Sequence, residues 1–238
     1  MGVSGTEKEC VSSPAWGLIA MCTDYRRNRT YAQYVQTFSH TAFPLILPEP
    51  HQSPNLMPQD EIRPTDPAPV FRRREHGLEM ITMRWGLVPW FHKGPLKGWR
   101  AMTVNARAES VATAPAFRDA FAKRRCLVPA DGWVEWKGEG KPKPKFFIKR
   151  RDGAPIMFAG LWDRCRTEDH GPVESFTIVT QPAGSPLNDL HDRAPVVLTS
   201  AEWERWLDTS AGVNDLLGPE SAGDYIVAPF APWTGDRA

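Results

Sequence analysis

The sequence predicts an α+β fold made mainly of antiparallel strands, arranged as a twisted, barrel-like sheet with a few flanking helices. Short apolar runs separated by turn residues recur along the chain, few segments have a helical period, and there is no internal repeat. The 238 residues are 41% apolar and 24% charged, enough to bury a sizeable core. The longest uncharged apolar run, residues 14–22, is too short to span a bilayer, so we expect no membrane association.

The first part of the chain is set apart from the rest. Residues 1–21 show neither a helical nor a strand period, and we expect them to be a disordered extension or a mis-assigned start. From residue 22 onwards no boundary is indicated, so residues 22–238 are expected to form a single domain.

Helices are predicted at three places. Residues 31–38 and residues 203–207 carry apolar side chains at the spacing of one helix face. The second of these segments is preceded by Thr199 and Glu202, which have the spacing of an N-terminal capping box. Another short helix is predicted over residues 115–123.

Strands are predicted where short apolar runs alternate with turn residues. By contrast, eight prolines occur in the 26 residues from 44 to 69, which predicts an extended connection there. The runs predicted to form strands are 80–89, 125–136, 145–150, 155–161, 174–180 and 195–198.

Charge is distributed unevenly along the chain. Residues 1–151 carry 24 basic and 14 acidic side chains, a balance of +10, whereas residues 152–238 carry 5 and 14, a balance of −9. Such asymmetry indicates either an anionic partner for one face or mutual neutralisation of the two parts in the folded chain. Several of the ten tryptophans adjoin basic residues, as rings do in grooves that bind single-stranded nucleic acid.

The cysteines indicate neither a metal site nor a redox pair. Cys10, Cys22, Cys126 and Cys165 have no CxxC or CxxH spacing, so we expect no metal and no cofactor. The first ten residues lack the positive start of a secretory signal. These observations predict a cytoplasmic protein with reduced thiols.

Three polar segments could carry chemistry. Strand alternation would place Glu135 on the same face as Trp133, where we expect burial to raise the pKa of its carboxyl toward the range useful for proton transfer. A strand-edge glutamate paired with a nearby lysine is the alternative. For His191 the alternative is a structural histidine, and for Asn105 a turn residue. The other polar members of these segments are Arg107, Asp131, Asp192 and Arg193.

Seven strings, spread over residues 21–230, resemble the SOS response-associated peptidase family in the family's own order. They are MC at 21–22, MRWGLVPW at 83–90, NARAE at 105–109, RCLVPADGWVEW at 125–136, FAGLW at 158–162, TIVT at 177–180 and HDRAPVVL at 191–198.

This resemblance implies a sensor and shield of abasic sites in single-stranded DNA, acting in the DNA damage response. The protein would become covalently attached to the ring-opened sugar. It would work as a monomer without a cofactor, in the cytoplasm, and associate with the nucleoid when bound to DNA. The family's catalytic residues correspond to Cys22, Asn105, Glu135 and His191. Its DNA-contacting positions correspond to Arg107, Trp90, Trp136, Thr180, Arg193 and Pro64.

The implied chemistry needs a cysteine at a chain start. Its amine forms a Schiff base with the sugar aldehyde, and its thiolate then closes a five-membered thiazolidine. An α-amine has a pKa of roughly 7.7–8, so part of it is neutral at physiological pH. By the resemblance, Glu135 transfers protons around imine formation, His191 helps to open the sugar, and Asn105 orients the terminal residue.

The sequence departs from the family pattern at two points. Thr23 and Asp24 follow the cysteine where the family commonly has glycine and arginine, so a cation is lost, for which Arg26, Arg27 or Arg29 could substitute. In addition, Cys22 is not the first residue. Translation could begin at residue 21, the chain could cleave itself before Cys22, or this member could be inactive.

Two other functions remain open from the sequence. One is an autoproteolytic thiol peptidase with Cys22 as nucleophile and His191 as base. The other is a non-covalent reader of single-stranded or modified DNA. The family name also leaves room for hydrolase or lyase activity.

Overall fold

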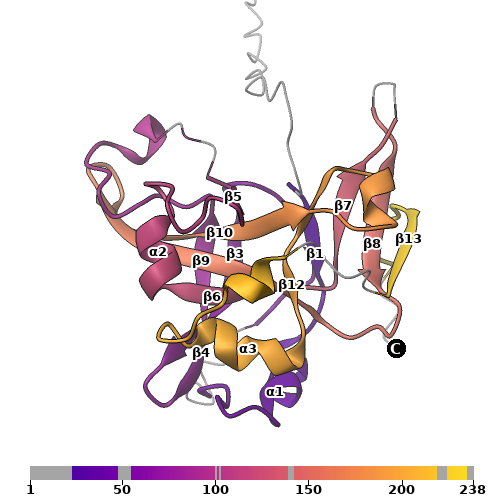
Figure 1. Ribbon diagram of the computed structural model, residues 1–238, viewed down its shortest axis with the longest axis horizontal. Coiled ribbons are helices and arrows are strands. Elements are labelled where there is room, and N and C mark those ends of the chain that lie inside the picture. Colours follow the sequence, from indigo (N-terminus) through magenta and orange to yellow (C-terminus); the bar gives the residue numbers. More distant parts are fainter. Residues whose placement is uncertain are drawn as a thin grey trace, which may run out of the picture.

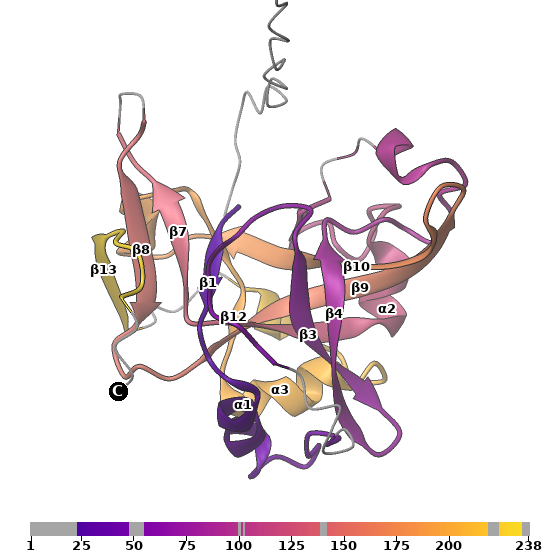
Figure 2. The same cartoon turned by 180° about the vertical axis from the view of Figure 1, so that it is seen from behind.

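The computed structural model describes residues 23–47, 55–99, 101, 103–138, 142–218 and 224–234. Within them lie a five-stranded sheet and an eight-stranded sheet, with a few short helices around them (Figure 1; seen from behind in Figure 2). The predicted α+β class with a mainly antiparallel, barrel-like sheet is confirmed. The expected extension over residues 1–21 lies outside the described residues.

The five-stranded sheet has the order β13-β8-β7-β1-β2, and all its neighbouring strands are antiparallel. Its strands are β1 (Tyr25–Arg27), β2 (Gln59–Ile62), β7 (Gly132–Trp136), β8 (Lys145–Arg150) and β13 (Tyr225–Pro229).

The larger sheet closes on itself. Its path runs β11-β10-β4-β3-β6-β9-β12, and the additional pairing of β9 with β10 joins five of these strands into a ring. Strand β5 pairs with β10, in parallel, as does β4. The strands are β3 (Pro67–Arg74), β4 (Gly77–Trp85), β5 (Asn105–Arg107), β6 (Arg125–Ala130), β9 (Ile156–Thr167), β10 (Gly171–Pro182), β11 (Arg193–Pro195) and β12 (Val197–Leu198).

The helices agree with the sequence at two of three places. Helix α1 (Tyr31–Phe38) has the predicted bounds, and α3 (Ser200–Leu207) begins at the predicted capping box of Thr199 and Glu202. Helix α2 (Arg118–Lys123) is shorter than the predicted segment 115–123. The 3-10 turns are η2 (Leu96–Gly98), η3 (Leu187–Asp189) and η4 (Asn214–Leu217).

The run 125–136 was predicted as one strand, and the structure corrects this. It is two strands, β6 and β7, which belong to different sheets. The break comes at Asp131, whose carboxylate accepts hydrogen bonds from the Asn28 amide at 2.5 Å and the Arg29 side chain at 2.8 Å. These contacts turn the chain out of the barrel and into the sheet that contains β1.

The connection predicted over residues 44–69 is also partly wrong, because β2 and the start of β3 lie within it. Pro67 and Pro69 are accommodated at the beginning of β3, opposite Arg84 and Thr82 of β4. A proline lacks an N–H donor, but a strand accepts it where that donor is not needed by the neighbouring strand.

Two apolar clusters hold these elements together. One packs α1 and α3 against the barrel, with the Phe38 and Trp203 ring centroids 5.2 Å apart, and the two helices lie together at one end of the barrel in both views (Figures 1 and 2). The other lies between the two sheets and includes Tyr25, Trp85 and Trp133. None of the described helices is long and apolar enough to cross a membrane.

Candidate active site

Strand β7 places Glu135 at the end of the core between the sheets. Trp133 and Glu135 lie two residues apart on this strand, so both side chains point to the face that carries Tyr25 opposite Trp133. Glu135 is only 3% exposed. The burial on which its expected proton-transfer role rests is therefore present. Lys145, the lysine on the neighbouring strand, contacts Glu61 and Asp24.

Trp136 lies on the opposite face of the same sheet. It pairs with Lys145 of β8, and the Lys145 Nζ is 5.4 Å from the centre of its ring. A cation beside an indole face is an arrangement that can also receive a stacked base and its phosphate. The side chains of Glu135 and Trp136 thus lie on opposite faces of one strand.

A second group of predicted residues gathers around the end of β10. Strand β5 runs parallel to it, with Asn105 opposite Ile178 and Arg107 opposite Thr180. On the other side β11 runs antiparallel, and the Arg193 side chain donates a hydrogen bond to the Thr180 carbonyl at 2.7 Å. Three strands, β5, β10 and β11, therefore bring together Asn105, Arg107, Thr180 and Arg193.

Sequence reasoning missed the partner of Arg193. Its guanidinium makes a two-pronged contact with the Glu109 carboxylate, at 2.6 and 2.9 Å. This contact lowers the pKa of Glu109, chiefly through the hydrogen bond. Arg107, by contrast, is exposed. Glu109, the acidic residue at the end of the NARAE string, was the sequence signal that could have predicted a partner for Arg193.

The His191 ring sits in the turn before β11 with two competing partners at Nδ1. The Arg193 amide lies 3.1 Å from Nδ1 and donates to it when that nitrogen is unprotonated. The Asp192 carboxylate lies 2.8 Å from the same atom and requires it to carry a hydrogen. The Nδ1 atom of His191 therefore has either a backbone partner or a carboxylate partner, depending on whether it carries a hydrogen.

Trp90, another of the predicted DNA contacts, is held by two aspartates. Its indole donates a hydrogen bond to Asp119 of α2 at 2.8 Å, and its backbone amide donates to Asp163 of β9 at 3.1 Å. The side chain is 52% exposed. A rigidly held and half-exposed indole is suited to stacking.

Pro64 lies in a tight turn directly after β2. The amide of Asp66 donates to the Arg63 carbonyl at 3.0 Å, and Thr65, with φ of 80°, occupies the left-handed region. Pro64 and Thr65 thus hold the two central positions of a type II turn.

Trp85 connects these groups, and sequence reasoning did not single it out. Its backbone pairs with Thr65 and Asp66 at 2.9 and 3.0 Å, and its indole donates to the Val104 carbonyl at 2.8 Å, one residue before Asn105. Its ring also lies 5.2 Å from that of Tyr25. A single buried tryptophan thereby ties the Pro64 turn, β1 and β5 to one another.

The predicted nucleophile Cys22 lies outside the described residues. The described chain begins at Thr23, and the Asp24 carbonyl accepts a hydrogen bond from the Val134 amide at 2.9 Å. Since Tyr25 pairs with Trp133 and Arg26 with Gly132, the same antiparallel register brings Thr23 opposite Glu135.

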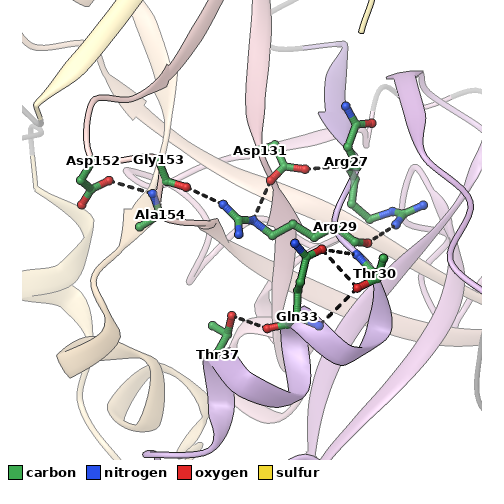
Figure 3. A network of polar contacts seen from close by, with 10 residues as sticks. Arg27, Arg29, Thr30, Gln33, Thr37, Asp131, Asp152, Gly153 and Ala154 are labelled. Carbon is green, nitrogen blue, oxygen red and sulfur yellow. Dashed lines mark hydrogen bonds and ion pairs between the residues drawn. The ribbon is translucent and has the colours of Figure 1, made fainter. Parts of the chain in front are cut away.

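The arginines expected to replace the missing cation are all engaged elsewhere. Arg26 is bound to Asp60 and the Ala231 carbonyl, at 2.9 and 2.6 Å. Arg27 and Arg29 belong to a polar network with Asp131 (Figure 3). The structure therefore corrects this expectation. The cations beside Asp24 are Lys145, at 3.7 Å, and Arg63, at 3.9 Å.

The other described thiols are poor nucleophiles. Burial raises the pKa of Cys126, which lies at the centre of the barrel wall. Burial, together with nearby Asp163, also raises the pKa of Cys165. A thiol needs its thiolate form to react, so neither of these two cysteines is suited to act as a nucleophile. No cluster of potential metal ligands occurs among the described residues.

Comparison with known proteins identifies the family. The model of the family described as SOS response associated peptidase (SRAP) matches residues 21–229. The chain belongs to the SRAP family. The match begins at the residue before Cys22 and includes both groups of site residues.

Several characterised SRAP-family relatives carry the name abasic site processing protein. YedK of Escherichia coli is 33% identical over 190 residues, which cover 79% of each chain. YoqW of Bacillus subtilis is 35% identical over 155 residues, covering 65% of this chain and 64% of the relative. For the Bacillus relatives YoaM and YoqW, the matched region thus spans slightly less than two thirds of their length.

Solved structures of similar proteins share the fold. A protein from Bacteroides thetaiotaomicron superposes with a TM-score of 0.73 at 26% identity, covering 88% of this chain and 92% of its own. A protein from Bordetella bronchiseptica gives a TM-score of 0.71 at 26% identity, covering 88% of this chain and all of its own.

Proposed function

We propose that this protein processes abasic sites in single-stranded DNA by attaching itself to them through a thiazolidine formed by an N-terminal Cys22. The observation that carries the proposal is the register of β1 on β7. It directs the chain that leads from Cys22 along the strand that bears buried Glu135. The proposal draws further support from the relatives, which are named for abasic site processing.

The chemistry proceeds in two steps, imine formation and ring closure. The free amine of Cys22 attacks the aldehyde carbon of the opened sugar, and loss of one water gives an imine. The thiolate then adds to the imine carbon, and the nitrogen takes up a proton, which closes the ring. Both nucleophiles are intramolecular after the first step, which favours the cyclic product.

We assign the roles of the neighbouring residues within this scheme. Glu135 removes a proton from the attacking nitrogen and delivers a proton to the departing hydroxyl oxygen during imine formation. His191 protonates the ring oxygen as the sugar opens, since its Nδ1 can exchange partners on protonation. Asn105 orients the terminal residue. The DNA strand on either side of the abasic site is bound by six residues: Arg107, Arg193, Trp90, Trp136, Thr180 and Pro64.

The chain start provides the decisive test. In the chain as written the nitrogen of Cys22 is an amide, which has no basic lone pair and cannot form an imine. A protein whose translation starts at Met21 should lose that methionine and form a heat-stable adduct with single-stranded abasic DNA but not with intact DNA. Intact-mass measurement identifies both the N-terminus and the adduct.

Two further variants separate the alternatives. Cys22→Ser should still bind DNA but give a labile adduct, whereas Cys10, Cys126 and Cys165 should be replaceable together without loss of crosslinking. If a chain shown by mass to retain residues 1–21 forms the stable adduct, the free-amine mechanism is wrong, and the thiol peptidase becomes the better hypothesis. If no chain forms an adduct but single-stranded DNA still binds, the non-covalent reader is favoured.

A further inference from the structure

A mixed-charge cluster occupies the outer face of the five-stranded sheet next to the start of β1. Glu61 of β2 and Arg63 just after it lie on one side of Asp24, and Lys145 of β8 lies on the other. Lys145 and Arg63 both form ion pairs with Glu61 as well. Four charged side chains from three segments therefore meet where the chain leads into Cys22.

Asp24 is the unusual member of this cluster. Its side chain is only 1% exposed, yet no N–H group of the described residues donates a hydrogen bond to either of its oxygens. Burial, followed by the nearby Glu61 charge, raises the pKa of Asp24 to about 7, against the opposing effect of Lys145 and Arg63. Although burial also acts on Glu61, the hydrogen bond from Lys145 lowers the pKa of Glu61. The fold thus maintains a costly buried carboxyl at a position where it attracts two cations.

The two cations retain capacity for another anion. Lys145 is 29% exposed at its side chain and Arg63 is 58% exposed. A lysine ammonium has three donors and a guanidinium five, whereas the described residues accept one hydrogen bond from each of these groups, both through Glu61. Donors remain that can reach an oxyanion approaching from solvent.

Their position relative to the DNA contacts indicates which anion this is. Arg63 immediately precedes Pro64, and Lys145 pairs with Trp136 in the sheet. A strand whose base stacks on Trp136 would carry its phosphate within reach of Lys145. We propose that Arg63 and Lys145 bind a backbone phosphate of single-stranded DNA beside the abasic site, and so supply the cation that position 24 lacks.

This inference rests on the proposed function for the identity of its ligand, but it is tested by binding alone. The probe is a fluorescent oligothymidine with one tetrahydrofuran residue, which mimics an abasic sugar and has no aldehyde to react. Equilibrium binding is measured by anisotropy across a series of salt concentrations. A protein that fails to crosslink to abasic DNA would contradict the proposed function and leave this measurement intact.

Lys145→Gln and Arg63→Gln should each weaken binding and make the slope of log K against log salt shallower by up to about 0.7, the value for the one phosphate contact that the two residues share. Lys145→Arg should keep the slope. The matched control is Lys149→Gln, which removes an exposed lysine from the same face of β8, about 13 Å further along at about 3.3 Å per residue. The control should bind as the unaltered protein does.

Thermal unfolding verifies that each variant is folded. Both positions are tested so that, if one variant does not fold, the other still tests the proposal. If folded Lys145→Gln and Arg63→Gln both keep the slope and affinity of Lys149→Gln, the proposed phosphate site does not exist. A slope that falls equally for all three variants would also overturn it, because the effect would then be a general loss of positive charge.

Discussion

The residues of the candidate site differ in what their surroundings allow. Glu135 is buried at the end of a strand whose other face carries Trp136 beside Lys145. A buried carboxyl can transfer protons to a group held next to it, whereas a ring beside a cation can bind a base. In the proposed function, two consecutive residues of the same strand therefore have different roles, proton transfer for Glu135 and DNA binding for Trp136.

This separation can be tested by single-turnover kinetics. Glu135→Gln should slow adduct formation at saturating abasic DNA by about 10²–10⁴, the usual contribution of a proton-transfer residue. Trp136→Ala should instead weaken DNA binding by roughly 1–3 kcal/mol and leave the saturated rate close to that of the unaltered protein. Equal saturated rates for Glu135→Gln and the unaltered protein would return Glu135 to a structural role.

Asp24 provides a prediction about stability and pH. Its folded pKa of about 7 lies above the ordinary value, so the fold favours the protonated form. The stability that this preference contributes is complete below the ordinary pKa of about 3.9 and is lost as the pH rises through 7. Asp24→Asn should therefore raise the melting temperature more at about pH 8 than at about pH 5.

The matched control is Asp152→Asn. Hydrogen bonds from Arg150 and the Ala154 amide lower the pKa of Asp152, so its contribution has the opposite sign and is present above its ordinary pKa. Because Asp152 is largely exposed, this variant should change the melting temperature little and downward. An Asp24→Asn profile parallel to that of the unaltered protein over this pH range would show that the carboxyl is ionised throughout.

The sequence predicted the candidate site residues but not what surrounds them. Asn105, Glu135 and His191 stand in strings that can be recognised one by one. The neighbours of Asp24 come from β2 and β8, and nothing in their local sequences relates them to it. Pairings of this kind depend on strand order, which short motifs do not encode.

Among the secondary-structure elements, helix starts were predicted correctly where the whole sequence signal lies at the start of the helix. The capping box at Thr199 and the apolar spacing of residues 31–38 gave the beginnings of α3 and α1, because each signal lies within the helix it starts. The division of residues 125–136 into β6 and β7 depends on contacts of Asp131 with Asn28 and Arg29. The apolar pattern of residues 125–136 cannot predict these contacts, because Asn28 and Arg29 lie about 100 residues earlier in the chain.

The turn between β2 and β3 holds a local conflict that can be relieved. Thr65 has a φ of 80°, although β-branched residues disfavour the left-handed region that this position of a type II turn requires. Thr65→Gly should raise the free energy of unfolding by about 1 kcal/mol, after the greater chain entropy of glycine is subtracted. Urea denaturation measures the change. Thr113→Gly is the control at an exposed turn threonine without positive φ, and it should be neutral or destabilising.

The whole molecule resolves part of the charge asymmetry seen in the sequence. Basic residues of the first 151 positions form ion pairs with acidic residues of the remainder, so the two parts neutralise each other over several contacts. Among the described residues these pairs are Arg72 with Glu174, Arg73 with Asp208, Arg124 with Asp163, Arg150 with Asp152 and Arg151 with Asp224. The excess positive charge of the first part is therefore not all available to a nucleic acid.

This neutralisation sets the expected salt dependence of DNA binding. If the strand contacts Arg107, Arg193 and the shared phosphate site of Arg63 and Lys145, the slope of log K against log salt should be about −2, from about 0.7 for each of three phosphates. Contact with all ten excess charges would give a slope of about −7 instead.

Binding of a single strand and of its duplex is compared by anisotropy over the same salt series. We expect the single strand to bind more tightly, because the exposed Trp90 and the half-buried Trp136 can stack only on unpaired bases. Equal affinity for both forms, or a slope near −7, would mean that the protein uses its overall charge and not these strand ends.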